Sequence, residues 1–165
     1  MYDFDKNDVQ IVNLLLENGR MPASEMARRI GDISERMVRY RIDQMVENGV
    51  IQISAVVNPN AFGLTVKADV WLEVDSDQIQ AVARKLAKQD NITYVACSIG
   101  ENDISIQLVA ADTQEIYHFV TDVIRKIPGV RKTTTSIVPL IVKDVYQWRV
   151  PERMAKLNPS GRGEK

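Results

Sequence analysis

The hydrophobic repeat of this chain changes once, and this change constrains the fold more than any other feature. Up to residue 48, apolar side chains recur every three to four residues, the spacing of one face of a helix. From Leu64 to Val74, every even position is Leu, Val or Ala, which is the period of two of a half-buried strand. The turn-forming sequence NPNAFG at 58–63 separates the two patterns. The 165 residues are therefore predicted to form two domains.

The helical spacing occupies three short blocks. Asp5 and Ser34 are good N-caps for the first and third blocks, since their side chains accept hydrogen bonds from free N–H groups of the first turn. The blocks predict helices over residues 5–18, 22–30 and 34–48. Three short helices, with a Gly-containing turn before the third, are typical of a helix-turn-helix domain.

The second part of the chain alternates between strand and helix patterns. Strands are predicted at 64–74, 92–99, 104–110 and 130–138, and helices at 79–86 and 116–127. The order β-α-β-β-α-β predicts an α+β fold, a ferredoxin-like four-stranded antiparallel sheet with both helices on one face. We expect the other face to be apolar and to form a homodimer, because it is predicted to carry Trp71, Val95, Cys97, Ile99 and Val109. The alternative is that the linker or the C-terminal segment VYQWRVP covers this face.

These patterns divide the chain into a helix-turn-helix domain at 1–51, a β-rich linker at 52–63, a ferredoxin-like domain at 64–150 and a tail at 151–165. The tail is predicted to be disordered, since it has Pro, Gly and charge but no periodicity.

Composition excludes several classes of protein. The chain has one cysteine and one histidine, Cys97 and His118, so it cannot form an internal disulfide or a zinc site from Cys and His alone. Both lie in apolar periodic segments and are expected to be core or half-buried residues. We expect no cofactor, no metal and no catalysis. The acidic N-terminus is unlike a signal peptide and no apolar run is as long as a membrane span, so a cytoplasmic location is expected.

Positive charge is concentrated around the third predicted helix. The formal net charge is −1, but residues 28–41 carry five arginines against two acidic residues. Arg36, Arg39 and Tyr40 are suited to contact bases and phosphates of double-stranded DNA. The alternative is a solvated helix face, on which Arg39 forms an ion pair with Glu35 or Asp43.

Several short motifs, in order and at the right spacing, resemble the Lrp/AsnC family of transcription regulators. The matching stretches are FDKNDVQIV at 4–12, NGR at 18–20, EMARRIG at 25–31, residues within IS…V…RI…M…GVI at 33–51, GEND at 100–103 and IPGV at 127–130. One departure is Asp32, an additional residue in the turn before the third helix.

The resemblance implies a winged-helix-like DNA-binding domain, and a sensing domain that dimerises through its sheet and assembles further, typically to an octamer. Its candidate DNA contacts are Ser34, Arg36, Arg39, Tyr40, Arg41 and Arg28. Arg41 matches a family position and is expected either to support the domain or to hold a phosphate.

The resemblance also implies a small effector, an amino acid, bound between dimers. Backbone N–H groups near Gly100 would hold its carboxylate, and Asp103 would accept from its ammonium group. The candidate effector-binding residues are Gly100, Glu101, Asn102, Asp103, Thr113, Thr134 and Ser136. The alternative is an ordinary hairpin turn, with Asp103 at the start of a strand. Two other functions remain open: a siroheme-decarboxylase-like enzyme of the same architecture, and a ligand-binding oligomer without DNA binding.

Overall fold

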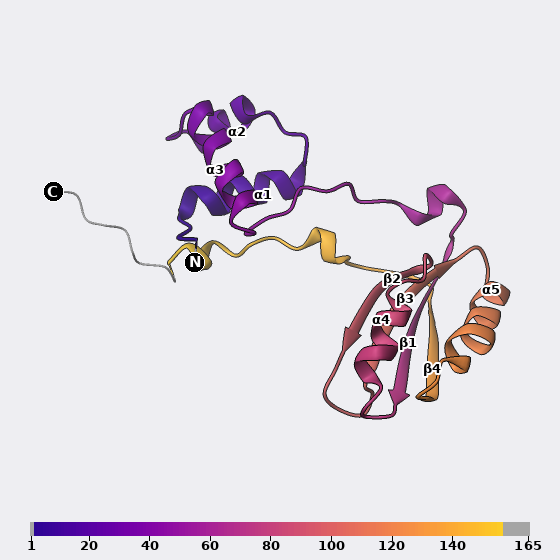
Figure 1. Cartoon of the computed structure of the whole chain (residues 1–165). Coiled ribbons are helices and arrows are strands. Elements are labelled where there is room, and N and C mark those ends of the chain that lie inside the picture. Colours follow the sequence, from indigo (N-terminus) through magenta and orange to yellow (C-terminus); the bar gives the residue numbers. More distant parts are fainter. Residues whose placement is uncertain (1, 157–165) are drawn as a thin grey trace. The chain divides into compact units, whose positions relative to one another are not determined.

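The computed structural model describes residues 2–156, which form two compact units (Figure 1). The helical unit contains residues 2–56 and 143–156, and the sheet unit contains residues 57–142. The chain therefore leaves the helical unit, forms the sheet unit and returns. No helix of the described residues has the length and apolar character that crossing a membrane requires.

Three helices build the first part of the helical unit: α1 (Lys6–Glu17), α2 (Ala23–Ile30) and α3 (Glu35–Glu47). Asp5 and Asp8 form a capping box at the start of α1, and the Ser34 side chain accepts a hydrogen bond from the Met37 N–H at the start of α3. Gly31 ends α2 with a φ of 95°, a backbone angle that residues with a Cβ rarely adopt. The core of the unit consists of Ile11, Met21, Ala23, Met26, Val38 and Met45.

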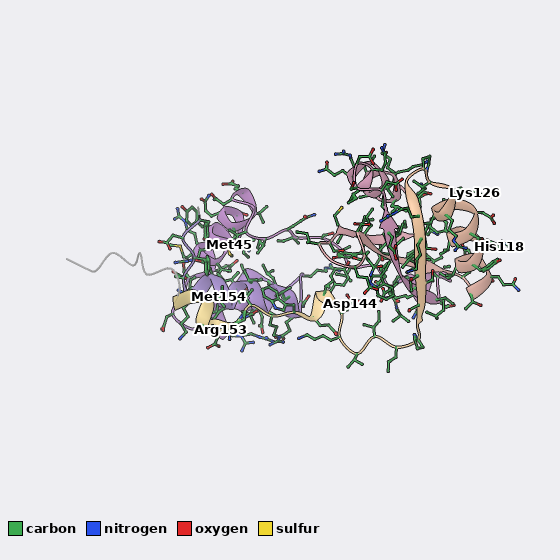
Figure 2. The ribbon with its side chains drawn as sticks, turned by 90° about the horizontal axis from the view of Figure 1, so that it is seen from below. Met45, His118, Lys126, Asp144, Arg153 and Met154 are labelled. Carbon is green, nitrogen blue, oxygen red and sulfur yellow. The ribbon has the colours of Figure 1, made fainter. Side chains whose placement is uncertain are left out.

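The C-terminal segment differs from its prediction in two ways. Residues 143–150 belong to the helical unit and not to the sheet unit. Two short 3-10 helices follow one another there, η4 (Val145–Gln147) and η5 (Glu152–Lys156), so the predicted disorder from residue 151 is wrong as far as residue 156. The segment is ordered because it packs on α1, a contact that periodicity cannot reveal (Figures 1 and 2). The remaining residues of the predicted tail, 157–165, lie outside the described part.

The predicted β-rich linker contains no strand. Residues 51–58 have no regular secondary structure, and the 3-10 helix η1 (Pro59–Phe62) follows them. Ile53, Val56 and Val57 are exposed. Side chains of this kind favour strands only where a neighbouring strand supplies hydrogen bonds and packing, and none does so here within the described chain.

The sheet unit has the predicted β-α-β-β-α-β order. Its elements are β1 (Val66–Val74), α4 (Ile79–Leu86), β2 (Ile92–Cys97), β3 (Ile104–Ala110), α5 (Thr113–His118) with its continuations η2 (Phe119–Val123) and η3 (Ile124–Lys126), and β4 (Val130–Val138). All strand pairs are antiparallel, and the sheet order is β2-β3-β1-β4. Even-numbered residues of β1 and β3 pack with Val82, Leu86, Ile116 and Ile124, so both helices cover one face of the sheet.

The open face of the sheet differs in part from the prediction. Trp71 lies on it, opposite Thr134 of β4. A bulge between Ile92 and Tyr94 shifts the register of β2, so that Val95 lies opposite Ile106 and packs in the helix-covered core. The same shift places Cys97 opposite Ile104. A bulge of this kind inverts the faces of all later positions in the strand, and an alternating pattern alone cannot locate it.

Of the remaining expectations for single residues, some agree with the structure and others do not. Val109 is buried and belongs to the open-face register of β3, whereas Ile99 lies in the loop after β2 and is fully exposed. Cys97 and His118 were expected to be core or half-buried, and both are exposed. Cys97 ends a strand that pairs on one side only, and His118 lies on the outer side of α5, where its ring approaches Asp122 (Figure 2).

Candidate DNA-binding surface and effector region

The exposed side of α3 carries Arg36, Met37 and Tyr40. Val38 and Met45 bury the opposite side in the core of the helical unit. Met37 is 44% exposed and Tyr40 is 58% exposed, large values for apolar and aromatic side chains. Positions three and four residues apart lie on the same side of a helix, so these three side chains form one surface. Among the described residues, Arg36 has no acidic partner.

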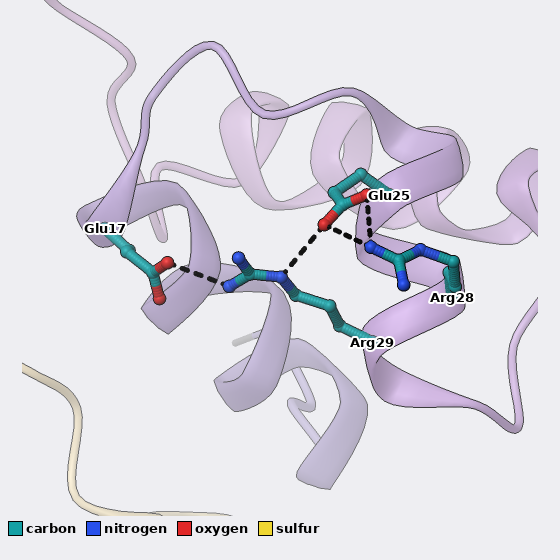
Figure 3. A network of polar contacts seen from close by, with 4 residues as sticks. All are labelled: Glu17, Glu25, Arg28 and Arg29. Atoms are coloured by element: carbon teal, nitrogen blue, oxygen red, sulfur yellow. Dashed lines mark hydrogen bonds and ion pairs between the residues drawn. The ribbon is translucent and has the colours of Figure 1, made fainter.

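The other predicted arginines of this surface are ion-paired. Arg39 donates to Glu35 of the same helix, which is one of the two pairs expected for a solvated face. Arg28 Nη2 lies 2.8 Å from both carboxylate oxygens of Glu25. Arg29 joins the same network, because its guanidinium donates both to Glu25 and to Glu17 of α1 (Figure 3). These pairs are exposed and are easily exchanged for phosphate contacts, because exposed ion pairs stabilise a fold by less than about 1 kcal/mol.

Arg41 does not belong to the exposed surface. Its Nη1 lies 2.9 Å from the Asp8 carboxylate and its Nη2 lies 2.9 Å from the Asp5 carboxylate, so it joins α3 to the start of α1. The Asp8 side chain is only 2% exposed. Of the two roles expected for Arg41, the structure therefore favours support of the domain over contact with phosphate. A buried carboxylate requires such a partner, because an unpaired charge inside a protein is strongly destabilising.

Tyr2 completes this ionic cluster, and sequence reasoning missed it. Its hydroxyl donates to Asp8 Oδ1 over 3.3 Å. Burial, and then the negative charge of Asp8, raise the pKa of Tyr2 to about 12. No spacing rule connects a residue before the first helix to Asp8 and Arg41, so only the fold brings the three together.

Ser34 acts in the structure as the N-cap of α3. Its Oγ accepts from the Met37 N–H over 3.2 Å, which occupies one of its acceptor positions. The hydroxyl proton is free to donate to a phosphate while the cap persists. The structure thus confirms the predicted N-cap, and the contact of Ser34 with DNA stays a prediction.

The predicted effector loop joins β2 to β3 and is partly engaged in the fold. Ser98 holds the loop through its Oγ, which donates to the Asn102 carbonyl over 2.8 Å, and through its N–H, which donates to the Asp103 carbonyl. The Asp103 carboxylate accepts from the Val74 N–H over 2.7 Å. The hairpin alternative thus describes part of what Asp103 does. Gly100 and Glu101 are exposed and remain accessible.

Two further charged residues, Asp75 and Arg131, flank Asp103. The Arg131 guanidinium lies 3.9 Å from Asp103 Oδ2 and 3.7 Å from Asp75 Oδ1. The sequence carries no signal for this group, because its members are far apart in the chain and meet only where β1, β3 and β4 are adjacent.

The structure does not bring all seven effector candidates together in one chain. Thr134 and Ser136 lie on the open face of β4, opposite Trp71 and Asp69. Thr113 follows the far end of β3, and Gly100 precedes its start, so a strand of seven residues separates them. At about 3.4 Å per residue this separation is roughly 20 Å. The described residues also contain no group of His, Cys, Asp and Glu that could hold a metal ion.

The fold and the exposed face of α3 define a helix-turn-helix protein with an appended ferredoxin-like domain. Comparison with known proteins agrees. Residues 4–52 match the winged helix-turn-helix DNA-binding family, and residues 67–148 match the Lrp/AsnC ligand-binding domain. The chain belongs to the Lrp/AsnC family of transcription regulators.

The similar proteins extend over most of the chain. An uncharacterized HTH-type transcriptional regulator of Pyrococcus abyssi is 34% identical over 86% of this chain and 90% of its own length. The HTH-type transcriptional regulator FL11 of Pyrococcus furiosus is 31% identical over 87% of this chain and 94% of its own. Because these relatives are regulators of transcription, the chain is a regulator and not an enzyme, as predicted.

Solved structures share the fold. AsnC of E. coli superposes with a TM-score of 0.78 at 23% identity, covering 88% of this chain and 99% of AsnC. A transcriptional regulator of Neisseria meningitidis, solved as a complex with L-methionine, superposes with a TM-score of 0.79 at 26% identity. The superposition covers 86% of this chain and 93% of the Neisseria chain.

Proposed function

We propose that this regulator recognises specific DNA sequences through α3 and changes its activity when it binds an amino acid. The observation that carries the first half is the side of α3 formed by Arg36, Met37 and Tyr40. It is exposed, it holds a guanidinium with no acidic partner among the described residues, and two preceding helices support it from behind. A helix held in this way can enter the major groove.

The three side chains suggest distinct contacts with DNA. The Arg36 guanidinium matches the two acceptors of guanine in the major groove, and the Tyr40 hydroxyl can donate to a phosphate. Met37 offers an apolar contact for a thymine methyl group. Arg39 and Arg28 add phosphate contacts once they leave Glu35 and Glu25, and Ser34 adds a donor at the start of the helix.

A homodimer, and a larger assembly such as an octamer, completes the proposal. The open face of the sheet carries Trp71 and Val109, whereas α4 and α5 pack on the other face. A second copy of the chain would bury this face and bring two helix-turn-helix domains to one duplex.

An amino acid is the effector that we propose, bound between dimers. The Neisseria regulator with L-methionine supports this class of ligand. Exposed backbone N–H groups at Gly100 and Glu101 suit a carboxylate, and the second oxygen of Asp103 suits an ammonium group. Thr134 and Ser136 lie on the open face, which the partner copy of the dimer would cover, and Thr113 would have to come from another chain. Such binding shifts the population of assemblies or of DNA-binding arrangements.

The DNA half is tested by selecting bound duplexes from random sequence with the wild-type chain and measuring affinity for the selected duplex. Arg36→Ala should weaken binding by about tenfold or more and relax the preference for one base pair, because a bidentate arginine–guanine contact is lost. Arg125→Ala, an exposed arginine of η3 in the other unit, is the matched control and should bind as the wild type does. Equal affinities for all three proteins would sink this proposal.

The effector half is tested by thermal unfolding with each common amino acid in turn, L-methionine included. A ligand that binds only the native state must raise the midpoint of unfolding. Asp103→Asn should abolish that rise while keeping the acceptor for the Val74 N–H. The absence of any rise with wild-type protein contradicts an amino acid effector.

A further inference from the structure

The last described residues, 143–156, form a strap that packs on α1 and is hydrogen-bonded to it through the side chain of Asn13. Asn13 Nδ2 donates to the Val150 carbonyl over 3.0 Å, and the Val150 N–H donates to Asn13 Oδ1 over 2.9 Å. A carboxamide presents a donor and an acceptor side by side, as a peptide group does. Asn13 therefore pairs with both polar groups of Val150 as a neighbouring strand would, although the strap lies on a helix.

The strap continues along the helical unit beyond this clamp. Pro151, Met154 and Ala155 are partly buried, and η5 runs beside α1 (Figure 2). Arg149 and Glu152 of the strap share a surface depression with Gln10, Asn13, Glu17 and Arg29. Arg29 is the same residue that joins Glu17 to Glu25 in the network of Figure 3. The strap thus lies against α1, with Arg29 of α2 beside it, while Met37 and Tyr40 of α3 remain exposed.

Two chain segments therefore connect the helical unit to the sheet unit. Residues 51–58 lead out of it without regular structure, and residues 139–144, after the end of β4, lead back to the strap. A domain held by a single irregular linker can reorient over a wide range. A second connection narrows that range only while its end stays fastened, and the hydrogen bonds of Asn13 fasten it.

We propose that Asn13 is a positioning residue for DNA recognition. By clamping the strap, it restricts how far and at what angle the helix-turn-helix domain of each protomer stands from the dimerised sheet units. It thereby sets the spacing of the two half-sites that one dimer accepts. The inference rests on the proposed sequence-specific, dimeric binding of DNA. Asn13 itself lies on α1 and takes no part in reading bases.

The test compares wild type with Asn13→Ala, which removes both hydrogen bonds but keeps a good helix former, and with Asn13→Asp, which keeps only the acceptor. Gln10→Ala is the matched control, since Gln10 lies one turn earlier in α1 and beside the same depression but contributes no hydrogen bond to the clamp. Each full-length protein is measured in two ways: by hydrogen exchange of a peptide containing Val150, and by affinity for a selected duplex with 5 bp inserted at its centre.

The insertion rotates the half-sites by about half a turn of DNA. Wild type and Gln10→Ala should lose about 100-fold in affinity, whereas Asn13→Ala should lose less than about tenfold and bind the original duplex within about fivefold of wild type. Exchange at Val150 should be at least about tenfold faster in Asn13→Ala, with Asn13→Asp between the two.

Two results would overturn the proposal: equal exchange at Val150 in wild type and Asn13→Ala, or an equal loss of affinity on insertion despite faster exchange. The second result would mean that the clamp only stabilises the helical unit. If the wild-type chain selects no sequence at all, the proposed DNA recognition fails, and the positioning role fails with it. The selection with wild-type protein alone reveals that outcome, before any variant is compared.

Discussion

Arginine side chains on the helical unit differ in what they contact, and the difference separates support from recognition. Arg41 is directed toward α1 and satisfies the buried Asp8. Arg28 and Arg39 lie at the surface but are paired with acidic residues of their own helices. Arg36 is exposed and has no acidic partner among the described residues. Residue type and local charge alone treat all four alike, whereas their surroundings assign them different roles.

The first prediction concerns Arg41. Arg41→Ala should lower the free energy of unfolding by about 2 kcal/mol, because it leaves the buried charge of Asp8 without its partner. The loss is no larger because water reaches part of the site. Arg39→Ala removes an exposed ion pair from the same helix and should change the free energy of unfolding by less than about 0.5 kcal/mol. Chemical unfolding followed by circular dichroism measures both. Equal losses in the two variants would contradict a supporting role for Arg41.

The second prediction concerns the ionisation of Tyr2. With its pKa raised from 10.0 to about 12, the neutral phenol is favoured in the folded chain. Its contribution to stability is therefore complete below pH 10 and is lost as the pH rises toward 12. The difference between the ultraviolet titrations of wild type and Tyr2→Phe isolates this group. A midpoint near 10 would show that the cluster with Asp8 does not form.

Helix α3 shows how one element serves both the core and the surface. Its Ser34 cap begins the helix, Val38 and Met45 anchor it, and Met37 and Tyr40 on its other side remain exposed. Glu35 in the first turn has two effects. It favours the helix, because a negative charge lies near the N-terminal end of the dipole, and it holds Arg39 away from any phosphate.

The third prediction follows for this element. Glu35→Gln should raise affinity for DNA several-fold and steepen the salt dependence of the logarithm of the binding constant by about one, because Arg39 becomes available to one more phosphate. Glu47→Gln, at the other end of α3, is the control and should leave both quantities unchanged. Binding isotherms at several salt concentrations give the slope. An unchanged slope in Glu35→Gln would mean that Arg39 does not contact DNA.

At the scale of the whole molecule, three features agree with the proposed association of several copies. The linker at 51–58 exposes apolar side chains without a neighbouring strand, and the open sheet face presents Trp71. The seven effector candidates also do not meet within one chain. Each of these features is unsatisfied in a single chain and is accounted for if several copies associate.

The fourth prediction tests this association. Trp71→Ala should weaken dimerisation by about 100-fold, because buried aromatic residues near the centre of an interface contribute most of its binding energy. Tyr117→Ala removes an exposed aromatic residue from α5, on the covered side of the sheet unit, and should leave the dimer intact. Sedimentation across a range of concentrations measures both. A dimer of undiminished stability in Trp71→Ala would place the interface elsewhere.

Sequence reasoning succeeded where a local pattern carries the information. The three helices, their caps at Asp5 and Ser34, and the β-α-β-β-α-β order follow from hydrophobic spacing and capping chemistry, which act over a few residues. The family followed from the order of its short motifs. The exposed positions of Arg36 and Tyr40 on α3 also followed, because the buried stripe of a helix determines its opposite side, whereas the exposed Met37 was missed.

Tertiary structure decided what depends on contacts between distant residues. The bulge in β2 moved Val95 into the core, Arg41 turned toward Asp8, and Asn13 pairs with Val150, just before a segment that composition predicts to be disordered. None of these has a periodic signal, because each arises from hydrogen bonds or ion pairs between segments that are distant in the chain. The sequence by itself therefore determined the elements and the class of regulator. Only the fold decided which side chains support α3 and which remain exposed on it.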